Sequence, residues 1–225
     1  MSADLTLILG SKTYSSWSLR PYLALRHAGL AFEEVVIPLR QTDSKARMLA
    51  HSPAGKVPAL IHRTGPHRAA GGDITVWDSL AICEYAAELA PDARLWPQDA
   101  GARAHARSIS AEMHSGFMDV RRNLFMDLGR TIDRPERLAK AAGDITRIQA
   151  IWADCLDRHG GPFLFGAFTI ADAMYAPVVT RFQTWKVPLS EASQAYVDAI
   201  EALPAMKDWR ADAAKETVVL DMLLD

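Results

Sequence analysis

The sequence predicts an α/β plus all-α fold, in which a mixed N-terminal domain is followed by a bundle of helices. Three observations predict it. Short apolar runs alternate with helical patterns over residues 1–90, residues 91–101 contain two prolines and no periodicity, and residues 102–225 carry helical patterns without a convincing strand. We therefore expect a first domain over 1–90, a linker over 91–101 and an all-α domain over 102–225.

The first elements are predicted to be a strand, a helix and a strand. Leu5–Leu9 is a short apolar run closed by Gly10, which favours a buried strand. A helical pattern over Leu19–His27 ends at Ala28-Gly29, a common helix stop, and Phe32–Pro38 contains consecutive β-branched residues. This order predicts a parallel strand pair joined by a crossover helix.

The N-terminal region continues with a short helix, two strands and a longer helix. We predict the short helix over Ser44–Ala50, one strand ending at Ile61, a second over Ile74–Trp77, and the longer helix from Asp78 until Pro91 ends it. Val57-Pro58 begins the first of these strands, where proline is tolerated and its peptide bond can be cis.

The C-terminal region carries several apolar stripes at helical spacing. One stripe from Ile109 to Leu124 predicts a single long helix, and another from Leu138 to Leu156 predicts a helix antiparallel to it. Thr169-Ile-Ala-Asp172 has the spacing of a capping box and marks a third helix. One or two short helices are expected over Val197–Trp209, broken at Pro204.

Composition indicates a folded protein with no global affinity for nucleic acid. The 225 residues are 49% hydrophobic and 23% charged, with a formal charge of −2 and a pI near 6.4. Cys83 and Cys155 are far apart and have no metal-ligand spacing, so we expect neither a disulfide framework nor a metal site. No signal-length or membrane-length apolar run occurs, and we expect a cytoplasmic protein without a membrane partner.

The stretch Lys12–Leu25 is the first candidate binding site. It places Ser15 and Ser16 at a helix start, where unsatisfied backbone N–H groups and the helix dipole favour an anion such as a thiolate, carboxylate or phosphate. An ordinary serine N-cap is the alternative interpretation. Asp78 and Ser79 form a second polar helix start of the same kind.

Several motifs in register resemble those of soluble, cytosolic glutathione S-transferases of the bacterial, zeta-like serine type. They are Ser15-Ser-Trp-Ser-Leu-Arg20, Gly55-Lys-Val-Pro58, Trp77-Asp-Ser-Leu-Ala-Ile82 and Thr169-Ile-Ala-Asp172. The resemblance covers nearly the whole chain. It implies a thioredoxin-like βαβαββα domain that binds glutathione, followed by a helical bundle, in a homodimer.

The resemblance also implies a role for each matching residue in binding glutathione. Val57 would pair its backbone with the cysteinyl part beside a cis Pro58, and Lys56 would reach the glycine end. Asp78 would meet the ammonium group of the γ-glutamyl end, and the helix start at Ser79 would hold its carboxylate.

Ser15 matches the serine that faces the glutathione sulfur, with Ser16 as the second choice. A thiol is mostly protonated at neutral pH, and only the thiolate is a good nucleophile. A hydrogen bond to a charged group contributes roughly 1.5–3 kcal/mol, which lowers a thiol pKa by about one or two units. Ser15 is therefore the predicted catalytic residue.

An electrophile would bind between the domains, against a helix that carries Met113, His114 and Phe117. Met113 and Phe117 belong to the apolar stripe, so core packing is the alternative for both. The motif also departs from the zeta pattern: Trp17 replaces a cysteine, Leu19 replaces a tryptophan and Pro21 follows Arg20. These departures speak against maleylacetoacetate isomerase activity, and a serine at position 15 excludes a mixed disulfide there.

The resemblance predicts an enzyme of detoxification that joins glutathione to small hydrophobic electrophiles, with glutathione as co-substrate and no further cofactor. The resemblance also extends to glutathione peroxidase activity. The alternatives are a glutathione-dependent cis–trans isomerase and a non-catalytic binding or scaffold protein.

Overall fold

The computed structural model describes residues 4–63 and 72–221. Its four-stranded sheet has the order β2-β1-β3-β4. β1 (Leu5–Gly10) is parallel to β2 (Phe32–Ile37), while β3 (Ala59–His62) is antiparallel to both β1 and β4 (Ile74–Trp77). The predicted parallel pair with its crossover helix is confirmed. The central β1 is buried along its whole length, as its apolar sequence predicts.

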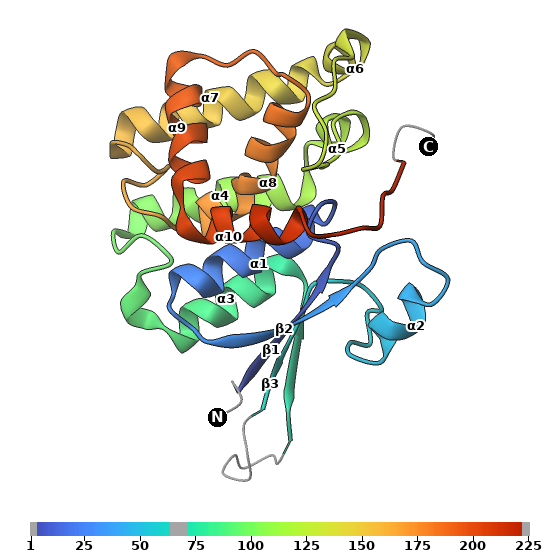
Figure 1. Ribbon diagram of the computed structural model, residues 1–225. Helices are drawn as coiled ribbons and strands as arrows, with labels where there is room; N and C mark the ends of the chain where they lie inside the picture. The colour runs from blue at the N-terminus through green and yellow to red at the C-terminus, as the bar shows by residue number, and fades with distance from the viewer. Residues whose placement is uncertain (1–3, 64–71, 222–225) are drawn as a thin grey trace.

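Two helices cover the face of the sheet that meets the rest of the chain. α1 (Ser16–His27) and α3 (Ser79–Leu89) lie between the sheet and the C-terminal helices, and the short α2 (Ser44–Leu49) lies on the opposite side (Figure 1). α1 is buried from Ser18 to Leu25 because it packs on the sheet, on α3 and on a C-terminal helix. The start of α1 therefore lies where the two parts of the chain meet.

From residue 91 to residue 221 the C-terminal part is built of helices, apart from two isolated β-bridges within residues 163–167, which confirms the α/β plus all-α fold. After a single 3-10 turn at Pro91–Ala93, its helices are α4 (Ala100–Ser115), α5 (Met118–Asn123), α6 (Pro135–Lys140), α7 (Ala142–His159), α8 (Ile170–Thr184), α9 (Glu191–Ala202) and α10 (Pro204–Ala213). The break before Pro204 was expected. The division into domains at residues 91–101 remains a prediction.

The single helix predicted over Ile109–Leu124 is wrong, because α4 ends before Gly116 and α5 begins after Phe117. Gly116 closes α4 with its N–H bonded to the carbonyl of Glu112, and a Cβ at Gly116 would lie 2.8 Å from that carbonyl oxygen. Phe117 then adopts a left-handed φ of 58°. The apolar stripe runs across the break because both helices pack on the same core, so periodicity alone hides it.

The capping box predicted at Thr169 is confirmed. The Thr169 side chain accepts from the N3 backbone, and the Asp172 carboxylate accepts from the Thr169 N–H at 2.8 Å. α8 is buried almost throughout and packs against both α1 and α4. It is therefore the central helix of the C-terminal part and the main support of α1.

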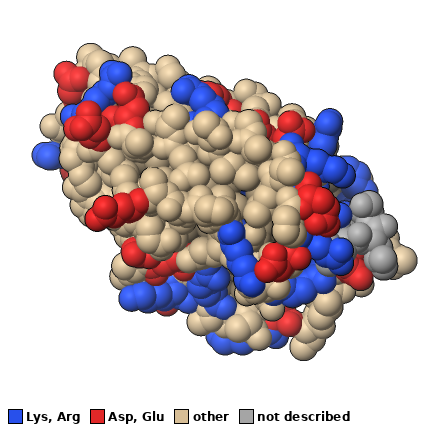
Figure 2. Space-filling view, turned by 90° about the horizontal axis from the view of Figure 1, so that it is seen from above, with Lys and Arg blue, Asp and Glu red and all other residues tan. Residues whose placement is uncertain are grey.

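Charged side chains are mixed on the face shown in Figure 2. Lys and Arg lie beside Asp and Glu there, around a broad area that carries neither. No helix of the described residues is long and apolar enough to cross a membrane.

Candidate functional site

A cavity of about 670 Å³ lies where the starts of α1, β3 and α3 come together. It is lined by Trp17, Ala54, Lys56, Val57, Pro58, Trp77, Asp78 and Ser79. Lys56, Val57, Pro58, Asp78 and Ser79 are all sequence-predicted glutathione residues. The structure therefore brings together groups from distant parts of the chain around one hollow.

The start of α3 forms one wall and is organised by Asp78. Asp78 has a left-handed φ of 79°, and its Oδ1 accepts hydrogen bonds from the N–H groups of Leu80 at 2.9 Å and Ala81 at 3.3 Å. Its Oδ2 lies 3.2 Å from Nε2 of His114 on α4. One carboxylate thus caps α3 and also reaches across to the helical part.

Val57 and Pro58 form another part of the wall, just before β3. The peptide bond between them is cis, as predicted. Pro58 is buried, Val57 is half-buried, and Lys56 is exposed beside the cavity. Exposure of Lys56 is compatible both with a ligand contact and with an ordinary surface lysine.

Ser15 occupies the N-cap position of α1, but its side chain makes no capping bond. Its hydroxyl is bonded to Ser18 Oγ at 2.7 Å, and Ser18 Oγ also accepts from the N–H of Gly10 at 3.0 Å. Ser15 is buried and does not itself line the cavity. A Cβ on Gly10 would lie 3.0 Å from both Ser15 Oγ and Val57 Cγ2, so the hydroxyl lies close behind the Val57 wall.

Ser16 has a different environment. Its hydroxyl accepts a hydrogen bond of 3.0 Å from Nη2 of Arg181 on α8, and Nη1 of the same arginine donates to the carbonyl of Leu124 at 2.6 Å. Ser16 is therefore tied to the helical part.

Arg20 lies behind the cavity wall, a position that the motif alone did not reveal. It is 1% exposed, its Nη1 lies 3.5 Å from Ser79 Oγ, and its Nε has no hydrogen-bond partner among the described residues. Burial, together with repulsion from Arg121 and Arg181, lowers the pKa of Arg20 to about 9. The guanidinium is still charged at neutral pH and adds positive potential behind Ser79.

Trp17 lines the cavity and packs against the guanidinium groups of Arg20 and Arg121. Its ring lies 4.4 Å from the guanidinium carbon of Arg20 and 4.8 Å from that of Arg121, and the ring of His114 meets it edge-on at 5.3 Å. Trp17 and Trp77 are 36% and 48% exposed, which leaves aromatic surface facing the cavity. The sequence identified Trp17 as a departure from the zeta motif but did not place it in the wall.

Two of the three residues predicted to contact the electrophile are buried in the core, and the third lies at the cavity rim. Met113 and Phe117 are 2% and 8% exposed and belong to the hydrophobic core, as their alternative interpretation expected. His114 reaches the cavity rim through its pair with Asp78. Arg121, from α5, donates to the carbonyls of Gly116 at 2.8 Å and of Met113, so it fixes the α4–α5 break beside Trp17.

Neither cysteine is placed for thiol chemistry. Cys83 and Cys155 are free and buried, and burial raises the pKa of both thiols. Within residues 4–63 and 72–221, no group of three or more His, Cys, Asp or Glu side chains is arranged to hold a metal ion.

This sheet order, the cis-proline before β3 and the helical region packed on α1 and α3 define a thioredoxin-like domain joined to an all-α domain. Family models described as the N-terminal and C-terminal domains of glutathione S-transferase match residues 14–89 and 135–212. The chain belongs to the glutathione S-transferase family.

Relatives in this family carry two kinds of name. Maleylacetoacetate isomerase of Rattus norvegicus is 31% identical over 182 residues, covering 78% of this chain and 76% of that protein. A probable maleylacetoacetate isomerase of Caenorhabditis elegans is 28% identical over 183 residues, 78% of this chain and 77% of the relative. Glutathione S-transferase Z1 of Arabidopsis thaliana is 27% identical over 215 residues, 88% of this chain and 90% of the relative.

Solved structures show the same fold. A glutathione transferase homologue from Burkholderia, crystallised with bound glutathione, superposes with a TM-score of 0.69 at 24% identity, over 95% of this chain and 100% of that one. A Tau class glutathione S-transferase from mango, Mangifera indica, gives a TM-score of 0.71 at 20% identity, over 94% of each chain.

Proposed function

We propose that the cavity binds glutathione and that the protein transfers its thiolate to small hydrophobic electrophiles. The observation that carries the proposal is that Val57, Asp78 and Ser79 face one cavity while Ser15 lies just behind it. The start of α3 supplies N–H donors for the γ-glutamyl carboxylate, and buried Arg20 adds positive charge behind Ser79. Asp78 receives the ammonium group, the backbone of Val57 pairs with the cysteinyl unit, and Lys56 reaches the glycine carboxylate.

Ser15 donates a hydrogen bond to the glutathione sulfur and thereby stabilises its ionised form. The thiolate then attacks the electrophilic carbon of the second substrate. In a substitution the leaving group departs with the bonding pair, and in an addition the adjacent carbon takes up a proton. Ser16 is the less favoured donor, because Arg181 on α8 holds its hydroxyl toward the helical part, whereas Ser15 Oγ lies beside the Val57 wall.

The exposed faces of Trp17 and Trp77 suit a flat or conjugated electrophile. Aromatic side chains offer a large apolar surface at small entropic cost, and both tryptophans line the cavity. Peroxidase activity would use the same thiolate on an organic hydroperoxide. Detoxification is the corresponding biological role.

The test combines glutathione binding by calorimetry with conjugation of a generic aryl halide. Ser15→Ala should lower kcat by about ten-fold or more and change the glutathione Kd little, because one hydrogen bond to a charge is lost. Ser16→Ala is the matched control and should retain most activity. Failure of the wild-type protein to bind glutathione would refute the proposal, and full activity of Ser15→Ala would move the donor role to Ser16 or to backbone groups.

The names of the rat and Caenorhabditis elegans relatives favour a second candidate, glutathione-dependent cis–trans isomerisation. In that reaction the thiolate adds to a conjugated double bond, rotation follows and the thiolate leaves again. Trp17 in place of the zeta cysteine weighs against it. Maleylacetone turnover measured beside aryl halide conjugation separates the two activities, and glutathione binding without either reaction would indicate a binding protein.

We further propose that the protein is cytoplasmic and acts as a homodimer. Light scattering of the purified chain gives its mass in solution directly. A mass of one 24.7 kDa chain at working concentration would contradict the dimer.

A further inference from the structure

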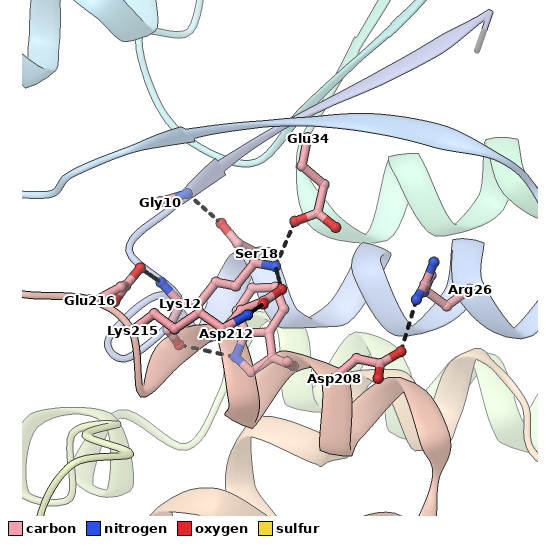
Figure 3. Close-up of polar contacts among 10 residues, drawn as sticks. Gly10, Lys12, Ser18, Arg26, Glu34, Asp208, Asp212, Lys215 and Glu216 are labelled. Atoms are coloured by element: carbon pink, nitrogen blue, oxygen red, sulfur yellow. Dashed lines mark hydrogen bonds and ion pairs between the residues drawn. The ribbon is translucent and has the colours of Figure 1, made fainter. Parts of the chain in front are cut away.

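Ser18 connects the end of β1 to the hydroxyl that the proposed reaction uses. Ser18 is 0% exposed and lies in the first turn of α1. Its Oγ accepts the N–H of Gly10, the last residue of β1, at 3.0 Å, and lies 2.7 Å from Ser15 Oγ (Figure 3 shows the bond between Gly10 and Ser18). Both serines are buried, so water does not compete freely for these bonds.

A hydroxyl has one hydrogen and two acceptor lone pairs, and its hydrogen rotates to suit its surroundings. The Gly10 amide can only donate, so one lone pair of Ser18 is committed to it. Ser15 donates to the other lone pair of Ser18. The Ser15 hydrogen then points at its neighbour, and a ligand sulfur must draw it away.

We propose that Ser18 is a positioning residue that makes Ser15 a stronger donor to the thiolate. This inference rests on the proposed function. When the thiolate enters, the Ser15 hydrogen turns to the sulfur and the Ser18 hydrogen turns to Ser15 Oγ, while the Gly10 N–H stays on Ser18. The oxygens keep their 2.7 Å separation and only hydrogens rotate. The result is a chain of donors from the backbone of β1 to the sulfur, each polarising the next.

Ser16 is held in a different place. Its oxygen accepts from a guanidinium of Arg181 on α8, which ties it to the helical part. Ser15 is instead linked through Ser18 to the end of β1, beside the Val57 wall, and this location distinguishes the two adjacent serines. It also explains why a buried N-cap serine leaves the helix N–H groups without a side-chain cap.

The test is the pKa of the glutathione thiol in the binary complex, followed by the ultraviolet absorbance of the thiolate against pH. Ser18→Ala should raise this pKa by about 0.5–1 unit. At a pH below the pKa, the fraction of bound glutathione that is ionised then falls by about three- to ten-fold. The glutathione Kd should change little. Ser18→Thr keeps the hydroxyl and should restore the wild-type value. In a Ser15→Ala background, Ser18→Ala should have no further effect, because Ser18 acts only through Ser15.

A measurement on the wild-type protein needs no variant. The NMR shift of the Gly10 amide proton should titrate with the thiol pKa in the glutathione complex and should stay constant in the complex with S-methylglutathione. Two results would overturn the role of Ser18 and leave the proposed function standing. One is a thiol pKa that is lowered in the wild-type complex and is the same in Ser18→Ala. The other is a Gly10 amide proton that does not titrate with the thiol. A wild-type protein that does not bind glutathione would instead refute the proposed function.

Discussion

Glu216 accepts a hydrogen bond of 2.6 Å from the backbone N–H of Lys12 through its Oε1. Figure 3 shows this contact. The other carboxylate oxygen of Glu216 accepts from the N–H of Thr13 at 3.0 Å, so one carboxylate binds two consecutive amides just before Ser15. These residues are about 200 positions apart in sequence. The segment after α10 is therefore a support of the loop that leads to the proposed catalytic serine.

The prediction for Glu216 follows from the two amides that it satisfies. Glu216→Ala leaves both without this partner, and an unsatisfied buried donor costs about 1–3 kcal/mol. We expect the free energy of unfolding to fall by about 2 kcal/mol and kcat to fall several-fold as the loop shifts, with a smaller change in the glutathione Kd. Exposed Glu88 on α3 is the matched control. Denaturant unfolding and aryl halide kinetics measure the two effects. An unchanged kcat would show that the position of the loop before Ser15 does not depend on Glu216.

Lys12 adds a pH-dependent contact to the same region. Its Nζ lies 2.6 Å from Glu34 on β2 and 2.7 Å from Asp212 on α10, between the rings of Tyr22 and Trp209. Burial alone would lower the pKa of Lys12, but the bonds to Asp212 and Glu34 outweigh it and the net pKa is raised above 10.5. The bonds to Lys12 and Lys215 lower the pKa of Asp212 below 3.8.

These shifts fix the sign of the pH dependence. The Lys12 contribution is complete below pH 10.5 and is lost as pH rises through the higher folded-state pKa. The Asp212 contribution is present above pH 3.8 and is lost as pH falls through its lower folded-state pKa. The stability difference between wild type and Lys12→Met should therefore be flat at neutral pH and shrink at both extremes. Urea unfolding across pH measures it, and a difference that changes around neutral pH would contradict this assignment.

Gly10 controls the space between Ser15 and the cavity wall. A Cβ there would lie 2.9 Å from Leu39 Cδ2 and 3.0 Å from Ser15 Oγ and Val57 Cγ2, all ends of side chains that can shift slightly. Gly10→Ala should fold but displace the Ser15 hydroxyl, raising the thiol pKa of bound glutathione by about 0.5–1 unit if one hydrogen bond is weakened. Gly143→Ala, where a Cβ meets nothing within 4 Å, is the control. A wild-type thiol pKa in Gly10→Ala would show that Ser15 does not need this space.

The sequence predicted most of the elements and most of the residues that line the cavity, because local chemistry determines them. It did not predict α5 and α6 as separate helices. Val57-Pro58, the polar start at Asp78 and the capping box at Thr169 each depend on neighbouring residues, and the structure has each as expected. The α4–α5 break was missed because an apolar stripe does not distinguish a continuous helix from two helices on one core.

Long-range pairs could not be predicted in the same way. The Glu216 contact with Lys12 and the Arg181 contact with Ser16 join residues separated by 204 and 165 positions. Neither periodicity nor a local motif encodes such pairs. In the sequence, Arg181 cannot be distinguished from an ordinary charged residue on a helix. The location of Arg20 behind Ser79 likewise depends on how α1 packs against α3.

Asp78 allows binding and folding to be separated. Asn can also accept the N–H of Leu80 and tolerates the φ of 79°, so Asp78→Asn should keep the cap of α3 and nearly all stability. It removes the charge proposed to meet the glutathione ammonium, and affinity should fall by about ten-fold or more. Asp78→Ala should also lose about 1 kcal/mol of stability. Calorimetry and thermal unfolding check both, and wild-type affinity in Asp78→Asn would remove Asp78 from the ligand contacts.

Asp172 is a fully buried carboxylate that holds the start of α8. It accepts from the N–H groups of Leu164 at 3.0 Å and Thr169 at 2.8 Å, and from the Thr169 hydroxyl at 3.1 Å. Asp172→Ala leaves these buried donors unpaired and should lower the free energy of unfolding by several kcal/mol, measured by denaturant. α8 packs on α1, so the same variant should also reduce activity.

The charge state of Asp172 provides a second and sharper test. Burial raises its pKa from 3.8 to about 6, against the opposing effect of its hydrogen bonds. Between these values the folded protein binds more protons than the unfolded chain, so stability should fall as pH rises through that window. The stability of wild type relative to Asp172→Asn, which does not titrate, should decrease by about 2–3 kcal/mol from pH 4 to pH 7. A relative stability that instead rises with pH would mean that the three hydrogen bonds to the carboxylate outweigh its burial.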